Sequence, residues 1–107
     1  MNAPEPDFSS LSEVDRLVHE PARLIIMANL YVVESADYTF LMRQAGLTWG
    51  NLSGHLSKLE EVGYIQIEKT YRGKRPYTLV RLSDNGRVVF KNYVAQMKNV
   101  LDNLETN

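Results

Sequence analysis

The sequence predicts one mainly α-helical domain that contains a small β-hairpin. Two observations predict this class. Apolar residues recur with helical spacing along most of the chain, and the spacing changes to strand-like alternation only within residues 65–82. A chain of 107 residues, of which 44% are hydrophobic, is long enough for one domain with an ordinary core.

The first third of the chain predicts a flexible start and two helices. Residues 1–10 are polar and contain two prolines, so we expect a flexible N-terminal segment. A short helix is expected over residues 11–17. Pro21 suits the first turn of the next helix, where its missing N–H costs no hydrogen bond. Residues 34–37 are expected to end that helix.

The centre of the chain predicts a pair of helices joined by a short turn. The first spans about residues 39–45 and the second spans residues 48–62, with Gly46 between them. Thr48 is a favourable N-cap residue, and leucines at i, i+4 and i+7 give the second helix one apolar stripe. Two helices joined by such a glycine-containing turn form a helix-turn-helix.

The last third predicts a hairpin and a long helix. Apolar and polar residues alternate over residues 65–68 and again over residues 77–82, as in half-buried strands. Turn chemistry covers residues 70–76, where Gly73 can adopt a positive φ. Ser83 is a good N-cap for the final helix. A hairpin that follows a helix-turn-helix makes a winged helix-turn-helix.

The net charge of −1 hides an uneven charge distribution. Residues 43–82 carry seven lysines and arginines against three glutamates, whereas residues 1–42 carry two cations against seven carboxylates. Four of the cations fall within the predicted hairpin turn or beside it: Lys69, Arg72, Lys74 and Arg75. A basic patch in an otherwise acidic chain is typical of a surface that binds nucleic acid, although a solvated loop is the alternative.

The helix after the turn carries small polar residues opposite its leucines, so we expect its N-terminal half to enter a DNA major groove. The residues expected to contact DNA are Thr48, Trp49, Gly50, Asn51, Ser53, Gly54, Ser57 and Lys58 from this helix, and Arg72, Lys74 and Arg75 from the hairpin. Arginine and glutamine, which read base edges with two hydrogen bonds, are absent from the helix front. Trp49 has a second interpretation, which is packing on the preceding helix.

The last helix carries an apolar seam with the 3, 4 spacing of a coiled coil. The seam consists of Phe90, Tyr93, Met97, Val100 and Leu104. Part of it must pack on its own domain, but beyond about Val94 the helix is expected to extend past so small a core. We therefore expect a homodimer, with residues 11–89 as the DNA-binding domain and residues 90–107 as the dimerisation helix.

The chain resembles the winged-helix transcriptional regulators related to the MarR and ArsR groups, over about residues 11–104. The motifs that carry the resemblance lie at residues 19–23, 46–48, 51–53, 55–56, 58–64 and 82–87. The resemblance implies a transcriptional regulator that binds specific double-stranded DNA sequences, and related regulators often bind a small-molecule effector near the dimer junction. Gly54 and Ser57 depart from the family, which often has larger polar or basic residues there. Trp49 also departs, since a small polar or acidic residue is common at its position.

Other functions find little support in the sequence. There is no cysteine, no pair of histidines at metal-ligand spacing and no glycine-rich phosphate loop, so we expect neither an enzyme nor a metal or cofactor. No apolar run approaches the length of a membrane span, and we expect a cytoplasmic protein without a membrane partner. The alternative function is a winged helix that binds another protein rather than DNA. The operator, the effector and the choice between activation and repression are not encoded in any motif we find.

Overall fold

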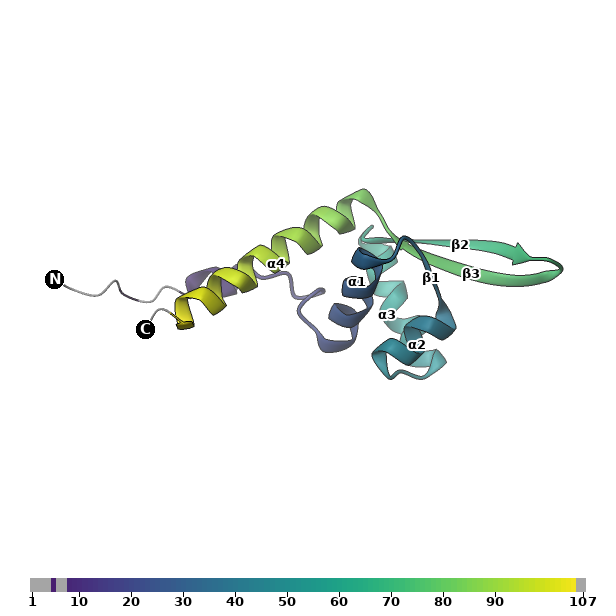
Figure 1. The fold of residues 1–107 in the computed structure, drawn as a ribbon, viewed down its shortest axis with the longest axis horizontal. Helices are drawn as coiled ribbons and strands as arrows, with labels where there is room; N and C mark the ends of the chain where they lie inside the picture. Colours follow the sequence, from purple (N-terminus) through teal and green to yellow (C-terminus); the bar gives the residue numbers. More distant parts are fainter. Residues whose placement is uncertain (1–4, 6–7, 106–107) are drawn as a thin grey trace.

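The computed structural model describes residue 5 and residues 8–105 (Figure 1). The elements, in chain order, are the 3-10 helix η1 (Ser9–Glu13), helix α1 (Pro21–Val32), strand β1 (Ala36–Asp37), helices α2 (Tyr38–Ala45) and α3 (Trp49–Glu61), strands β2 (Ile65–Arg72) and β3 (Arg75–Leu82), and helix α4 (Asp84–Glu105). The predicted class, a mainly α-helical winged helix-turn-helix with a small hairpin and a long last helix, is confirmed.

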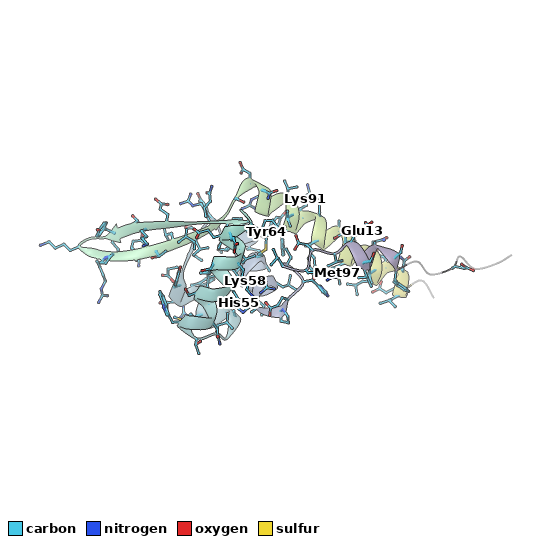
Figure 2. All side chains as sticks on the ribbon, turned by 180° about the vertical axis from the view of Figure 1, so that it is seen from behind. Glu13, His55, Lys58, Tyr64, Lys91 and Met97 are labelled. Carbon is cyan, nitrogen blue, oxygen red and sulfur yellow. The ribbon has the colours of Figure 1, made fainter. Side chains whose placement is uncertain are left out.

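Helices α1, α2 and α3 form a body from which two long features extend (Figure 1). The β2–β3 hairpin projects from one end of this body. Helix α4 runs the other way, and η1 lies against its C-terminal half, where Figure 2 labels Glu13 and Met97. The predicted boundary between residues 89 and 90 falls inside α4, which is one continuous helix. The division into a DNA-binding domain and a dimerisation helix stays a prediction.

The core lies where α1, α2 and α3 meet strand β3. The largest side chains that are fully buried are Ile26, Met27, Leu30, Leu41, Leu52, Leu56, Leu59, Val18 and Val80. The three leucines of α3 are those that the helical spacing assigned to its apolar stripe. The leucine face of α3 therefore packs on the core, and its opposite face is exposed to solvent.

The turn between α2 and α3 is fixed by capping at both helix ends. Gly46 ends α2 in the left-handed conformation, at φ 64°, which glycine adopts without strain. The Oγ1 atom of Thr48 accepts a hydrogen bond from the backbone N–H of Asn51 at 3.2 Å, so Thr48 caps α3 as predicted. These two caps set the direction in which α3 leaves the turn.

The N-terminal region differs from its prediction. Instead of a helix over residues 11–17, the 3-10 helix Ser9–Glu13 is followed by turns. At Asp15 the chain starts a separate turn, in which the carboxylate accepts hydrogen bonds from the backbone N–H groups of Leu17 and Val18 at 2.8 and 3.2 Å. Such local bonds compete with helix formation. Most of the predicted flexible segment, residues 1–10, lies outside the described residues, and its last two residues belong to η1.

The sheet also differs from its prediction, in two respects. Strand β1 was not predicted; it pairs antiparallel with β3 and gives a three-stranded sheet of order β1-β3-β2. The turn predicted over residues 70–76 is wrong in length, because the strands continue to Arg72 and resume at Arg75. Gly73 takes the positive φ of 64° that was expected, so a two-residue turn suffices.

The junction between the hairpin and α4 is closely packed. The Ser83 side chain accepts a hydrogen bond from the backbone N–H of Gly86 and donates one to the carbonyl of Gly63, which confirms Ser83 as the cap of α4. A Cβ atom on Gly86 would lie 1.9 Å from the carbonyl oxygen of Tyr64. Nearby, the Tyr64 hydroxyl donates a hydrogen bond to the carboxylate of Asp15, which ties the N-terminal segment to the start of the hairpin.

Candidate nucleic-acid interface

Helix α3 presents a polar face to solvent because its leucines bury the opposite face. None of the eight residues predicted to contact DNA from this region is buried. The exposed ones are Thr48, Trp49, Gly50, Asn51, Gly54, Ser57 and Lys58, and Ser53 is half-buried. The N-terminal half of α3 is therefore accessible to a partner, as a recognition helix requires.

Two glycines on this exposed face are not required by the fold. A Cβ atom at Gly50 or Gly54 would meet nothing within 4 Å. Glycine in an exposed helix interior costs about 1 kcal/mol relative to alanine. The packing of the chain itself therefore gives no reason for glycine at either position.

The charges of α3 favour its N-terminal end as the anion-binding end. Its first turn contains no acidic residue, and the unpaired backbone N–H groups there attract negative charge. The exposed Glu60 and Glu61 lie at the other end. A phosphate is accordingly favoured near Thr48 and disfavoured near the C-terminus of the helix.

The tip of the hairpin concentrates positive charge on exposed side chains. Arg72, Lys74 and Arg75 are all exposed. Arg72 and Arg75 are paired directly opposite each other across the two strands. Like charges at opposite positions destabilise a hairpin, so this arrangement has a cost in the free protein that a polyanion would remove. Arg81, nearer the base, is neutralised by an ion pair with Glu68 at 2.9 Å.

Trp49 packs on the helix before it, as one of the two interpretations predicted, and still remains accessible. Its ring lies 4.7 Å from the ring of Tyr38 in α2, measured between centroids. The side chain is nevertheless 59% exposed. Trp49 also lines a hollow together with residues 76–78 of β3, so the start of α3 lies beside the distal part of the hairpin.

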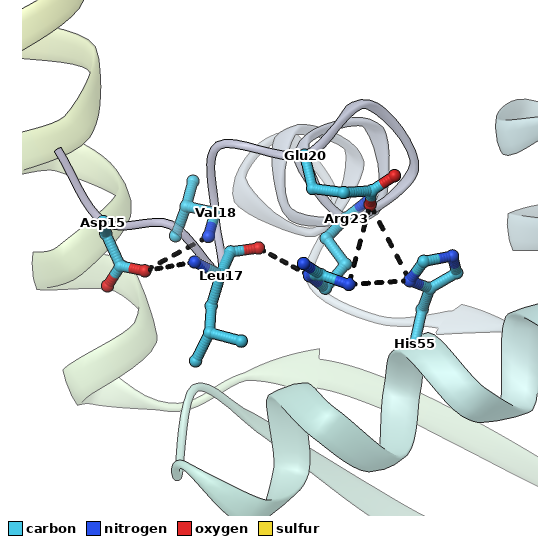
Figure 3. Close-up of polar contacts among 6 residues, drawn as sticks. All are labelled: Asp15, Leu17, Val18, Glu20, Arg23 and His55. Atoms are coloured by element: carbon cyan, nitrogen blue, oxygen red, sulfur yellow. Dashed lines mark hydrogen bonds and ion pairs between the residues drawn. The ribbon is translucent and has the colours of Figure 1, made fainter.

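A buried arginine connects α3 to the start of α1 (Figure 3). Arg23 is 9% exposed, and its Nε atom donates a hydrogen bond to the carbonyl of Leu17 at 2.6 Å. Its Nη1 atom lies 3.1 Å from Nδ1 of His55 in α3 and 3.8 Å from a carboxylate oxygen of Glu20. Because a buried cation is costly unless it is paired, these contacts fix α3 against α1.

Glu20 completes this cluster as the N-cap of α1. Its carboxylate accepts the backbone N–H of Arg23 at 2.8 Å and lies 3.7 Å from Nδ1 of His55. Burial alone would raise the pKa of Glu20. Hydrogen bonds from the backbone of Arg23 and Ala22, together with the charges of His55 and Arg23, outweigh that effect and leave the pKa below its usual value. Sequence spacing could not reveal this cluster, because His55 is 32 residues from Arg23.

Three of the five residues predicted for the dimer are buried by their own chain. These are Phe90, Tyr93 and Val100, while Met97 is half-buried and Leu104 is exposed. The rings of Phe90 and Tyr31 of α1 lie 5.3 Å apart, and the Tyr93 hydroxyl lies 2.8 Å from Nδ1 of His19. The seam thus serves first to dock α4 on its own domain.

A different stripe of α4 is apolar and exposed. It contains Val94, Leu101 and Leu104, of which the last two are 54% and 59% exposed. Helix α1, which packs against α4, also exposes Ile25 and Val32. The spacing of Val94, Leu101 and Leu104 at seven and then three residues was visible in the sequence. Because Leu104 belongs to both sets, and Val94 and Leu101 lie beside the seam, the sequence did not separate the exposed stripe from the buried residues.

A helix-turn-helix with a solvent-exposed second helix, followed by a basic hairpin, defines the class of winged-helix DNA-binding proteins. Residues 22–101 match the family of winged helix DNA-binding domains, and the chain belongs to this family. In the part of the chain that the structure describes, no helix is long and apolar enough to cross a membrane. The same described residues contain no group of three or more side chains placed to hold a metal ion.

Known proteins share both the sequence and the fold. The chain is 34% identical over 90 residues to the uncharacterized protein MJ0432 of Methanocaldococcus jannaschii, which covers 84% of this chain and 98% of that protein. A transcriptional regulator homologue from Pyrococcus horikoshii OT3 is 31% identical, with a TM-score of 0.84 over 90% of this chain and 97% of that one.

A MarR-family regulator from Silicibacter pomeroyi shares the fold at 21% identity, with a TM-score of 0.66 over 91% of this chain and 65% of that one. The predicted winged-helix family is confirmed, and the fold is shared with a MarR-family regulator. The family is that of winged helix DNA-binding domains, and a transcriptional regulator homologue shares the fold.

Proposed function

We propose that the protein is a homodimeric transcriptional regulator that binds specific sequences of double-stranded DNA. One observation carries the proposal: the exposed, polar start of α3 lies beside a hairpin whose tip carries Arg72, Lys74 and Arg75. Helix α3 then occupies the major groove, and the arginines reach the backbone or the adjacent minor groove, where negative potential attracts them.

In this proposal the hairpin supplies most of the affinity and α3 supplies a modest specificity. Contacts between cations and phosphates hold a protein on any DNA sequence. Base edges are read by side chains, and apart from Lys58 the polar side chains predicted to contact DNA from α3 are short. The groups that could reach a base are Asn51, Ser53, Ser57 and Lys58. We expect each good base contact to contribute about 1–3 kcal/mol of discrimination.

The homodimer is supported by the exposed apolar stripe of α4. Val94, Leu101 and Leu104 lie along one helix at heptad-like spacing without cover from the described chain. A two-fold pairing would place each stripe against its copy. The proposed contact therefore consists of Val94, Leu101, Leu104 and Met97. Met97 and Leu104 come from the predicted set, whereas the buried Phe90, Tyr93 and Val100 are left out of the contact.

A small-molecule effector, which related regulators often bind, could occupy an apolar hollow at the start of α1. The hollow has a volume of about 340 Å³ and is lined by His19, Glu20, Pro21, Leu24 and Ile25. It lies at the start of α1, beside the contact of His19 with Tyr93 of α4. A ligand there would touch Glu20, which caps α1, and His19, whose Nδ1 atom contacts Tyr93 of the helix proposed to form the dimer.

The test is a selection of bound duplexes from a random DNA library, followed by titrations of a selected and a random duplex. With about six to ten phosphate contacts in a dimer, affinity should fall by about 10³–10⁵ between about 50 and 200 mM salt. Sedimentation of the protein alone should give a dimer at micromolar concentration.

Two results would contradict this function. If no duplex is enriched and binding does not respond to salt, the interface is one for another protein, which is the alternative function that the sequence left open. If the protein binds DNA but sediments as a monomer both alone and on DNA, the DNA-binding proposal stands and the homodimer does not.

A further inference from the structure

A hollow separates the start of the helix-turn-helix from the hairpin. It has a volume of about 270 Å³. Its walls come from Tyr38 and Thr39 at the start of α2, from Trp49 at the start of α3, and from residues 76–78 of β3. These three segments are separated along the sequence and are brought together only by the fold. The hollow therefore forms only when the hairpin and the helix pair are packed together.

The position of the hollow follows from the DNA-binding function proposed above, on which this inference rests. In B-form DNA the major and minor grooves are separated by a single sugar–phosphate strand. If α3 enters the major groove while the tip at Arg72 and Arg75 meets the neighbouring minor groove, that strand must pass between them. The surface between the start of α3 and the hairpin is this hollow.

The chemistry of the hollow suits a sugar better than a phosphate. Trp49 and Tyr38 present aromatic surface, and among the described residues no lysine or arginine lines the hollow. The one carboxylate in the lining, that of Asp37, accepts the backbone N–H of Phe40 at 2.8 Å and would repel a phosphate. Aromatic rings make favourable contacts with the apolar C–H face of a sugar ring.

A cation is placed beside the hollow rather than inside it. The guanidinium of Arg72 lies over the ring of Tyr77, 4.9 Å from its centroid, and Tyr77 is one of the lining residues. This contact holds a flexible side chain at the hairpin edge of the hollow. A phosphate that follows a sugar seated in the hollow would therefore meet a preplaced positive charge.

We propose that this hollow seats one deoxyribose of the strand that separates the two grooves. Trp49 and Tyr38 contact the sugar, and Arg72, held by Tyr77, binds the adjacent phosphate. The seat contributes affinity for every DNA sequence. Its aromatic part releases no counterions, so that contribution does not weaken as salt rises.

Trp49 makes the test direct because it is the only tryptophan in the chain. The emission of the wild-type protein should change as a random 20-base-pair duplex is added at low salt. Trp49→Ala should weaken binding of that duplex about tenfold, which corresponds to the loss of roughly a third of the contact surface of an aromatic side chain. The slope of log affinity against log salt should stay that of the wild type.

Matched variants distinguish loss of the proposed sugar contact from loss of a phosphate contact and from loss of stability. Arg72→Ala should weaken binding and reduce the salt slope by about one per lost phosphate contact. Trp49→Phe, which keeps an aromatic ring, should recover most of the affinity that Trp49→Ala loses. Because Trp49 is largely exposed, thermal unfolding of both Trp49 variants should remain close to that of the wild type.

Three results would overturn the seat. Trp49→Ala could bind the duplex as tightly as the wild type, or lower the salt slope as Arg72→Ala does. Alternatively, Trp49 emission could ignore DNA and respond to millimolar tetramethylammonium, which would indicate a site for an organic cation formed by the rings and Asp37. If the wild type binds no duplex at low salt, the proposed function fails as well; if it binds, only the seat is at issue.

Discussion

Replacing Gly54 by alanine should stabilise the protein and weaken its binding to DNA. Gly54 lies in the interior of α3, and an added Cβ atom would meet nothing within 4 Å. Alanine is favoured over glycine in an exposed helix interior by about 1 kcal/mol. The free energy of unfolding should therefore rise by about that amount, and the Tm by about 4 °C or more for a domain of this size.

The same methyl group should reduce DNA affinity. It would stand on the face of α3 that the proposed complex presses into the major groove. Forcing an extra methyl group into a packed contact costs about 1–3 kcal/mol, so affinity for a selected duplex should fall about fivefold or more. Glycine would then be retained at this position for binding, at the expense of folding.

The assay combines urea or thermal unfolding at one fixed protein concentration with a duplex titration. Gly86→Ala is the contrasting variant. Its Cβ atom would lie 1.9 Å from the carbonyl oxygen of Tyr64, so this variant should be destabilised. If Gly54→Ala raises the Tm but binds DNA like the wild type, the groove does not approach the helix there. A lower Tm for Gly54→Ala would contradict the open space that the structure shows.

Three further predictions address the hairpin, the dimer and the response to pH. Replacing Arg72 and Arg75 by alanine should weaken binding to selected and random duplexes alike in titrations, and a loss confined to the selected duplex would reverse the assigned role. Replacing Leu101 and Leu104 by glutamate should give a folded monomer by sedimentation, because unpaired charges would be buried in a symmetric contact; a dimer that persists would place the interface elsewhere. Burial and a hydrogen bond to a carboxylate raise the pKa of Tyr64 from 10 to about 12, so its contribution to stability is complete below pH 10 and is lost between pH 10 and 12. Unfolding measured across that range should show a steeper decline for the wild type than for Tyr64→Phe, and equal declines would contradict the assignment.

Local sequence signals were sufficient to predict helices α1 to α4, but not the N-terminal region, where a 3-10 helix and turns replace the expected helix over residues 11–17. Pro21, Thr48 and Ser83 each act over one helical turn, and each occupies the predicted position at the start of a helix. The leucine spacing of α3 likewise predicted which of its faces is buried. These signals are readable because their partners lie within a few residues along the chain.

Features that depend on distant partners could not be predicted in this way. Strand β1 has two residues and exists because Ala36 pairs with Val80. The pairing of Arg23 with His55 depends on how α1 packs on α3, which no spacing encodes. The seam containing Phe90 was predicted to form the dimer, whereas Phe90 and Tyr93 are buried within their own chain, because α4 packs on α1 in a way that no spacing encodes.

The continuity of α4 has a consequence for the operator. Twenty-two residues form this helix, and its only glycine, Gly86, lies in the first turn beside the hairpin. In the proposed dimer, this uninterrupted helix in each copy would hold the two recognition helices at a fixed separation. Half-sites on one face of DNA are spaced by about 34–36 Å, one turn of the double helix. The operator should therefore tolerate single base changes far better than the insertion or deletion of base pairs between its two halves.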